Sequence, residues 1–124
     1  MAATKFEELE VWQIAFALSR KVYASSRNEQ FAKDFGLRDQ ARRAAVSCMA
    51  NIAEGFTRQS RREFIRFLDI ARSSAAELQS HLYMARAEEY VSETEFDEIY
   101  TECQRLRYGL TSLIRHLKTT EAPK

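Results

Sequence analysis

The strongest constraint on this fold is an apolar pattern in the C-terminal third of the chain, where the spacing alternates between three and four without a break. Residues three and four apart lie on one face of an α-helix, and a sustained heptad spacing is typical of helices packed nearly antiparallel at about 20°. The pattern therefore predicts a helix over about 93–118 that packs against other helices. Its members are Phe96, Ile99, Cys103, Leu106, Leu110, Leu113 and Leu117.

A first helix is predicted over about 7–26, and it carries two adjoining apolar stripes. One stripe is Leu9, Trp12, Phe16 and Tyr23, and the other is Val11, Ala15, Leu18 and Val22. This width exceeds what one helix–helix seam requires, so it indicates burial against two neighbours or against another subunit. The polar residues 27–36 predict a loop, with one short turn around Phe31 and Phe35.

Two further helices are predicted over about 37–54 and 61–88. Small inward residues let two helix backbones approach closely. The inward face of the second helix is Ala41, Ala44, Ala45, Cys48 and Ile52. The third helix repeats the three–four spacing with Phe64, Phe67, Ala71, Ser74, Leu78, His81 and Ala85.

Capping residues suggest where these helices begin and end. Gly55 directly follows the second helix, and we interpret it as a C-terminal stop, because glycine enters the left-handed region without a Cβ clash. Ser60 is followed three residues later by Glu63, and Ser92 by Glu95. This S-x-x-E spacing is a capping box, which predicts the starts of the last two helices.

Four helices joined by short connections predict an all-α, antiparallel up-down-up-down four-helix bundle. The 124 residues fit one domain, 1–124, with an ordered core of about 6–118. The chain has only three Gly and one Pro, too few to punctuate many strands. No apolar run approaches the ~18 residues of a membrane span, and the N-terminus lacks a secretory apolar region, so we expect a cytoplasmic protein with no membrane partner.

The sequence contains no constellation that indicates an enzyme. A di-iron bundle needs Glu-x-x-His on two helices and a further Glu on each of the others, but His81 and His116 are the only two histidines, and neither follows that pattern. Cys48 and Cys103 lie on apolar stripes, where a buried thiol is unreactive. The three Gly are isolated, so no phosphate-binding loop exists. We therefore expect no catalytic residues, no metal, no cofactor and no small-molecule substrate.

Charge is distributed unevenly along the chain although the formal net charge is only +1. Residues 38–72 hold eight arginines against four acidic residues, whereas residues 88–104 hold seven acidic residues and no basic one. The arginines are candidates for nucleic-acid binding, and phosphate binding grows with the number of contacts made together. The candidate set is Arg42, Arg43, Arg58, Arg61, Arg62, Arg66 and Arg72.

A less specific interpretation of these arginines is a solvated face with ion pairs three or four residues apart, for which Glu63 and Asp69 are available partners. Two functions then compete. One is an oligomeric protein that binds RNA or DNA through a basic arginine surface. The other is a protein-interaction scaffold without nucleic-acid binding, suggested by the double stripe on the first helix and by Ile65, Ile70 and Tyr83.

One segment resembles a known family. The stretch 46–55 contains Ser-x-x-x-Asn-Ile-Ala-Glu-Gly, which looks like the hallmark of bacterial four-helix-bundle proteins encoded by intervening sequences within large-subunit ribosomal RNA genes. The segments 6–13, 36–44 and 64–78 resemble other parts of that family, in order and spacing, so the resemblance covers about 6–117. One departure is Arg72-Ser73, where a small residue is expected before the serine.

The resemblance implies a four-helix bundle that often assembles as a ring-like homopentamer. It also implies a relationship to the accessory proteins of diversity-generating retroelements, which form basic pentameric barrels that work with a reverse transcriptase and nucleic acid. For most family members the biochemical function is not established, so the resemblance predicts the fold and a homo-oligomer better than a function.

The polar residues of the hallmark segment have two interpretations. Asn51, Glu54 and Gly55 could form a ligand site at the end of the second helix. The structural interpretation is that Gly55 stops the helix while Asn51 and Glu54 bond to backbone groups, because buried polar groups must be paired. Ser74 and Glu77 on the third helix could face Asn51 or Glu54 across the helix pair. We favour the structural interpretation.

Overall fold

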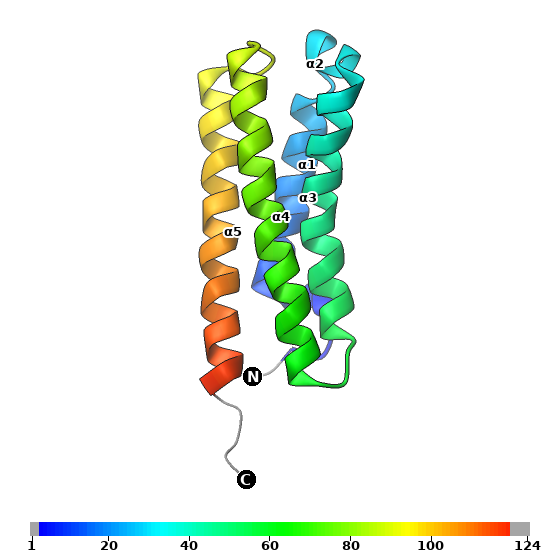
Figure 1. The fold of residues 1–124 in the computed structure, drawn as a ribbon, viewed down its shortest axis with the longest axis vertical. Helices are drawn as coiled ribbons and strands as arrows, with labels where there is room; N and C mark the ends of the chain where they lie inside the picture. The colour runs from blue at the N-terminus through cyan, green and yellow to red at the C-terminus, as the bar shows by residue number, and fades with distance from the viewer. Residues whose placement is uncertain (1–2, 120–124) are drawn as a thin grey trace.

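The computed structural model describes residues 3–119, and α-helices account for most of them. In Figure 1 the chain passes up one long helix, down the second, up the third and down the fourth, and the residues described contain no strand. The predicted all-α four-helix bundle is therefore confirmed. Residues 1–2 and 120–124 of the predicted domain lie outside the described part. The elements are η1 (Phe6–Glu8), α1 (Glu10–Ser25), α2 (Glu29–Lys33), α3 (Phe35–Phe56), α4 (Arg61–Ala87) and α5 (Glu93–Thr119).

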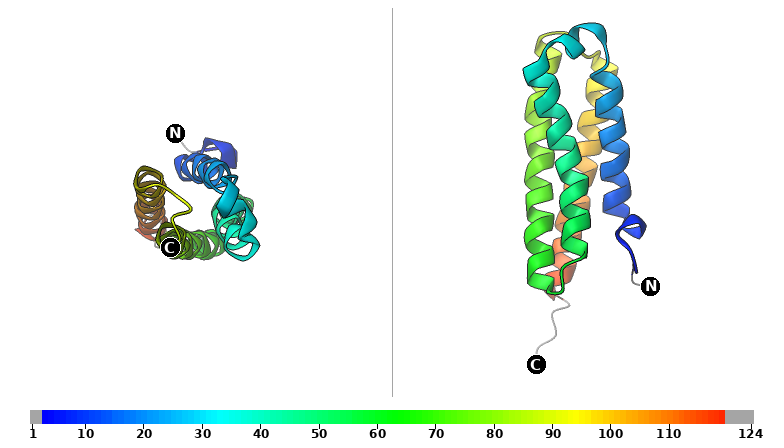
Figure 2. Two further views of the ribbon diagram at one scale, coloured as in Figure 1. Left: turned by 90° about the horizontal axis from the view of Figure 1, so that it is seen from above. Right: turned by 90° about the vertical axis from the view of Figure 1, so that its right-hand side faces the viewer.

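A single apolar core lies along the shared axis of the four long helices, which surround it in the end-on view of Figure 2. The small residues predicted to line the second helix are all buried on α3. On α5 the predicted heptad is buried from Phe96 to Leu110, but Ile114 then enters the core while Leu113 and Leu117 stay partly exposed. Buried positions drift around a straight helix because it has 3.6 rather than 3.5 residues per turn.

The N-terminal half is more broken than the periodicity predicts. Leu9 has an extended backbone conformation (φ −73°, ψ 128°), so the first helix divides into η1 and α1 there. The predicted loop contains the five-residue helix α2, which connects the upper ends of α1 and α3 in Figure 2. Phe31 of α2 is buried, whereas Phe35 is exposed and begins α3. The tertiary contact of Phe31 explains why a polar segment forms a helical turn.

The interpretation of Gly55 as a helix stop is wrong. Gly55 lies in the last turn of α3, which continues to Phe56, and its φ is not positive. A Cβ placed on Gly55 would stand 2.6 Å from the Cβ of Phe67 and 3.1 Å from Cδ1 of Phe64. Glycine is needed here because the α3 and α4 backbones approach too closely for any side chain, not because the backbone turns left-handed.

Both predicted capping serines begin their helices. The Ser60 hydroxyl accepts from the backbone N–H of Glu63 at 2.9 Å, but the Glu63 carboxylate bonds Arg66. At α5 the box is reciprocal, because the Ser92 hydroxyl accepts from the Glu95 N–H at 3.0 Å and the Glu95 carboxylate accepts from the Ser92 N–H at 2.9 Å. These bonds satisfy N–H groups that a helix start leaves unpaired.

Candidate nucleic-acid interface

The hallmark asparagine belongs to a hydrogen-bond chain between α3 and α4. The Asn51 side-chain amide donates to the Ser47 carbonyl oxygen at 2.9 Å and to the Ser47 hydroxyl at 3.0 Å. The Ser47 hydroxyl is 2.9 Å from that of Ser74, which is only 7% exposed. Ser74 thus faces Asn51 through Ser47, across the closely packed helix pair. These hydrogen bonds connect α3 to α4, and they use the Asn51 side-chain N–H group within the protein.

The two acidic residues of the motif lie apart from that chain. The Glu54 carboxylate accepts from Arg58, just after the end of α3, at 2.8 Å, and Glu77 lies 3.3 Å from the His81 ring. Both carboxylates are exposed. Glu77 therefore does not meet Asn51 or Glu54, and the five motif residues do not converge on one ligand site.

Four of the seven candidate arginines gather at the end of the bundle where α3 connects to α4. The guanidinium groups of Arg58 and Arg66 both lie over the ring of Phe67, 4.9 and 4.7 Å from its centroid. The hydrogen bond from Arg66 holds the pKa of the Glu63 carboxyl below its usual value, with further help from the charges of Arg58 and Arg62. Two of the four cations are already paired, Arg58 with Glu54 and Arg66 with Glu63.

Arg72 belongs to a different part of the surface. Its guanidinium donates to Asp69 at 2.6 Å and to the hydroxyl of Thr111 on α5 at 3.1 Å. The Ser47–Ser74 contact sets the register of α3 against α4 and places Arg72 near residue 49 of α3, about 10 Å below Arg42 at a rise of about 1.5 Å per residue. The seven arginines therefore do not form one continuous strip within a subunit.

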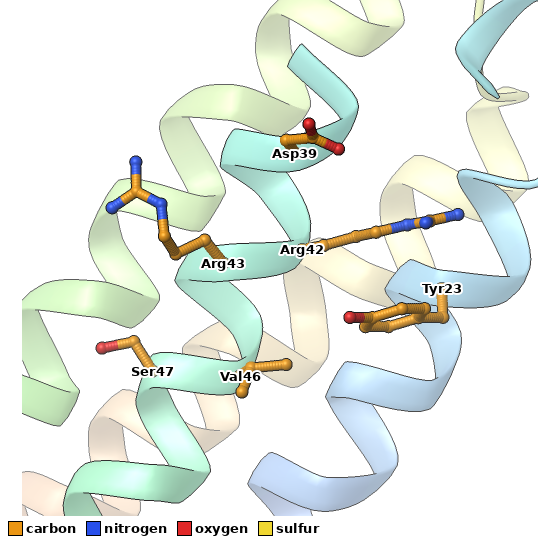
Figure 3. A pocket seen from close by; sticks show the side chains of 6 residues that line it. All are labelled: Tyr23, Asp39, Arg42, Arg43, Val46 and Ser47. Atoms are coloured by element: carbon orange, nitrogen blue, oxygen red, sulfur yellow. The ribbon is translucent and has the colours of Figure 1, made fainter. Parts of the chain in front are cut away.

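Arg42 and Arg43 leave α3 in opposite directions, as Figure 3 shows. Arg42 reaches across to α1, where its guanidinium donates to the Ser26 hydroxyl at 2.7 Å and lies 4.6 Å from the centroid of the Tyr23 ring. Arg43 points the other way and donates to Gln40 at 2.8 Å. An arginine has five N–H donors, so both groups keep donors for a further acceptor.

The surface between α1 and α3 is hollowed into a continuous groove, which we call the α1–α3 groove. Its larger part has a volume of about 600 Å³, and a smaller part of about 460 Å³ shares Tyr23 and Val46 with it. Two aromatic side chains on α1 stand out from the core here, Phe16 at 43% and Tyr23 at 37% exposed. The basic residues that line the groove are Arg20, Lys21, Arg27, Arg42 and Arg43.

None of these five cations forms an ion pair with an acidic side chain of residues 3–119. The single acidic residue in the lining, Asp39, is bound to Arg38 at 2.9 Å. An anion that enters the groove therefore meets positive charge that the protein has not neutralised. At the α3–α4 end, by contrast, only Arg61 and Arg62 are unpaired.

The first helix held a signal that segment-by-segment charge counting missed. Phe16, Arg20 and Tyr23 follow one another at spacings of four and three on α1, so they form one helical stripe. Arg27 follows four residues later, in the turn after α1, so aromatic and basic residues alternate along this segment. In the structure this stripe faces α3 rather than the core, which α1 contacts through Val11, Ile14, Ala15, Leu18 and Val22. The wide apolar surface predicted for the first helix is thus divided between the core and the groove.

The part of the chain that the structure describes contains no metal-binding cluster, no reactive thiol and no membrane-spanning helix. No three His, Cys, Asp or Glu side chains are grouped so that they could hold a metal ion. Both cysteines are buried and unpaired, and burial raises the pKa of Cys48 to about 12 and that of Cys103 further. Within residues 3–119, no helix has the length and apolar character needed to cross a bilayer.

Comparisons with known proteins agree with the bundle. The model of the 23S rRNA-intervening sequence protein family matches residues 7–112. A solved structure from Bacteroides thetaiotaomicron, a protein with unknown function from the S23 ribosomal protein family, superposes with a TM-score of 0.78 at 29% identity, covering 85% of this chain and 98% of that one. No curated protein matches the chain.

Proposed function

This chain belongs to the 23S rRNA-intervening sequence protein family, and on that premise we propose that it is a non-enzymatic, cytoplasmic protein that binds nucleic acid in the α1–α3 groove. The observation that carries the proposal is the set of five unneutralised cations around a groove whose floor exposes two aromatic rings. Phosphate groups bind side chains of this kind, and the binding strengthens with each additional contact.

The groove is a better candidate than the arginine-rich end of the bundle because fewer of its cations form ion pairs within the protein. A guanidinium that already pairs with a carboxylate has part of its positive charge neutralised, so it attracts a phosphate less strongly. Arg58 and Arg66 are in this position, whereas Arg20 and Arg27 are not. Arg61 and Arg62 at the α3–α4 end are a second, separate pair of cations without an ion pair among residues 3–119.

Self-assembly is the second part of the proposal. We propose a ring-like homo-oligomer, with a pentamer favoured, in which the basic grooves of several subunits act together. The acidic first half of α5 supports it. Glu93, Asp97 and Glu98 are exposed, and among the described residues their one ion pair is that of Glu93 with Arg86 at 3.7 Å. These carboxylates are therefore available to cations of a neighbouring subunit. A ring multiplies the phosphate contacts available to one strand.

The test is a titration of RNA and DNA oligonucleotides across a range of salt concentrations, followed by fluorescence anisotropy. We expect a Kd that is micromolar or lower. The logarithm of the association constant should fall linearly with the logarithm of the salt concentration, with a slope of about 0.7–0.9 for each phosphate contact. The double variant Arg20→Gln/Arg27→Gln should reduce that slope by about 1–2. These two residues hold no ion pair, so the variant should fold normally.

The matched control is Arg61→Gln/Arg62→Gln, which removes the same charge from the other end of the bundle. A smaller loss than in the groove variant supports the proposed site. A larger loss would move the site to the α3–α4 end. Absence of salt-dependent binding to any oligonucleotide at 50 mM salt would reject the nucleic-acid function altogether and favour the scaffold alternative, for which the exposed Ile70 and Tyr83 on α4 provide apolar surface.

A further inference from the structure

The aromatic rings on the floor of the α1–α3 groove indicate which form of nucleic acid the groove would bind, whereas the cations alone do not. We propose that the groove binds single-stranded nucleic acid, with bases stacked against Phe16 and Tyr23 and the backbone held by the flanking arginines. This inference rests on the proposed function, which requires only phosphate binding. It adds which form of nucleic acid is bound and which residues select it.

The two rings are held as a rigid platform. Trp12 stacks on Phe16 with their centroids 5.3 Å apart and their planes 10° from parallel. The Arg42 guanidinium covers Tyr23 in the same way from the side of α3, and Figure 3 shows it lying across the ring. Each ring therefore has one face supported by the protein while a large part of its surface remains exposed. A ring that is fixed before binding loses little conformational entropy when a base stacks on it.

The positions of the cations fit a backbone that follows the helices. Phe16 and Tyr23 are seven residues apart, about 10 Å along α1 at about 1.5 Å per residue. Arg20 lies between them in the same stripe and Arg27 continues it, while Arg42 and Arg43 provide positive charge from α3. Aromatic side chains interleaved with basic ones along a groove are the arrangement by which proteins bind single strands.

A duplex would not use this floor. Its bases are stacked on one another and present only their edges in the grooves, so flat rings on the protein surface would gain no base contact from it. Exposed Phe16 and Tyr23, with Val46 and Met49 beside them, would then remain as apolar surface that nothing covers. A single strand places unpaired base faces against these rings and its phosphates against the rim.

The two serine hydroxyls in the groove lining are already bonded within the protein. Ser19 donates to the Ala15 carbonyl oxygen at 3.0 Å, and the Ser47 hydroxyl contacts both Ser74 and Asn51. Hydrogen bonds to base edges are what distinguish one base from another, whereas stacking accepts every base. The groove should therefore bind single strands with little sequence preference.

The experiment compares a single-stranded RNA of about 20 nucleotides, the same sequence as DNA, and a duplex with the same number of phosphates per strand, at fixed salt. The variants Phe16→Leu and Tyr23→Leu remove one ring each while they keep the charge and an apolar side chain. The controls Tyr83→Leu and Tyr108→Leu remove tyrosines that are exposed elsewhere, at 49% and 66%. Thermal melting and circular dichroism establish that each variant is folded.

We expect the wild-type protein to prefer the single strands. Each groove variant should lose about 5- to 100-fold in single-strand affinity with no change for the duplex, and the controls should lose none. Trp12 is the only tryptophan and lies against Phe16, so its fluorescence should change when a single strand binds and not when a duplex binds. The spectroscopic change separates contact at the platform from binding elsewhere.

Three results would overturn the inference, and they are distinguishable. If Arg20→Gln/Arg27→Gln weakens binding but strands and duplex bind equally and the ring variants bind as well as wild type, the proposed function stands and the single-strand inference is wrong. If neither form binds, both are wrong. If the ring variants lower the oligomer size in sedimentation without altering RNA affinity, the rings contact a second copy of this chain instead.

Discussion

Gly55→Ala is the sharpest test of how α3 and α4 are held together. Two effects oppose each other. Alanine is a better helix former than glycine by about 1 kcal/mol in a helix interior, so the substitution favours α3 on its own. The added methyl group, however, would lie 2.6 Å from the Cβ of Phe67 and 3.1 Å from Cδ1 of Phe64. A Cβ cannot rotate away, so the two helices must separate.

Overpacking of a close-packed core costs about 1–3 kcal/mol, and contact between two backbone-attached carbons belongs at the upper end of that range. The helix-propensity gain offsets about 1 kcal/mol of it, which leaves a net loss of about 2 kcal/mol. For a chain of this length, 1 kcal/mol corresponds to about 3–5 °C in Tm. We therefore expect Gly55→Ala to lower Tm by about 6–10 °C.

The other two glycines are matched controls, because all three lie in helices without positive φ. A Cβ on Gly36 would meet only an oxygen of Asp34 at 3.9 Å, so Gly36→Ala should be neutral or raise Tm slightly. A Cβ on Gly109 would stand 3.1 Å from a methyl group of Val11, so Gly109→Ala should fall between the other two. Thermal and urea unfolding followed by circular dichroism would give this order, and a Gly55→Ala protein as stable as Gly36→Ala would refute the close approach of α3 and α4.

Three further outcomes are expected. Asn51→Ala should lower the free energy of unfolding by about 0.5–1 kcal/mol in urea titrations, because it removes the amide that bonds Ser47; an unchanged Tm would contradict the structural role of Asn51. Burial works to raise the pKa of Glu95, but hydrogen bonds from the Ser92 backbone, Ser25, Asn28 and the Ser92 hydroxyl outweigh it and hold that pKa below 4.5. The unfolded chain therefore protonates first as the pH falls, so the stabilisation is present above pH 4.5 and is lost through the lower pKa of the folded state. Glu95→Gln should accordingly flatten the dependence of Tm on pH below that point, and an equally steep dependence would count against the assignment. A thiol reagent such as dithionitrobenzoate should leave Cys48 and Cys103 unmodified in the native protein and label both in denaturant, because both are buried with raised pKa values; rapid native labelling would show that the core opens.

The helical architecture could be predicted because periodicity and capping agree. The start of α4 at Arg61 and that of α5 at Glu93 follow directly from Ser60 and Ser92, whose hydroxyl caps are local interactions. Features that depend on contacts distant in sequence could not be predicted. The break at Leu9 has no strong local signal. The sequence predicts a short turn around Phe31 and Phe35, but not that Phe31 is buried while Phe35 is exposed. Gly55 looks like a helix stop until the position of Phe67 is known.

In the candidate site, too, local interactions could be predicted and contacts distant in sequence could not. Arg58, Arg66 and Arg72 belong to the arginine-rich segment 38–72, yet each pairs with a carboxylate three or four residues before it. Arg66 and Arg72 share a helix with their partners, whereas Arg58 lies just after the end of α3. This local neutralisation was foreseeable as an alternative, since residues at these spacings are neighbours on a helix surface. What the sequence could not show is that Arg42 turns away from α4 to bind Ser26 at the end of α1.

Net charge summed over a segment is therefore a poor guide to where this protein attracts an anion, and the immediate helical neighbours of each cation are a better one. Arg20, Lys21 and Arg27 have no carboxylate three or four residues away in either direction, and neither do Arg61 and Arg62. Both groups keep their charge for an external partner. Only the first group alternates with exposed aromatic rings. If the proposed function and the single-strand inference hold, Arg61→Gln/Arg62→Gln should weaken binding of single strands and duplex equally, whereas Arg20→Gln/Arg27→Gln should weaken binding of single strands more.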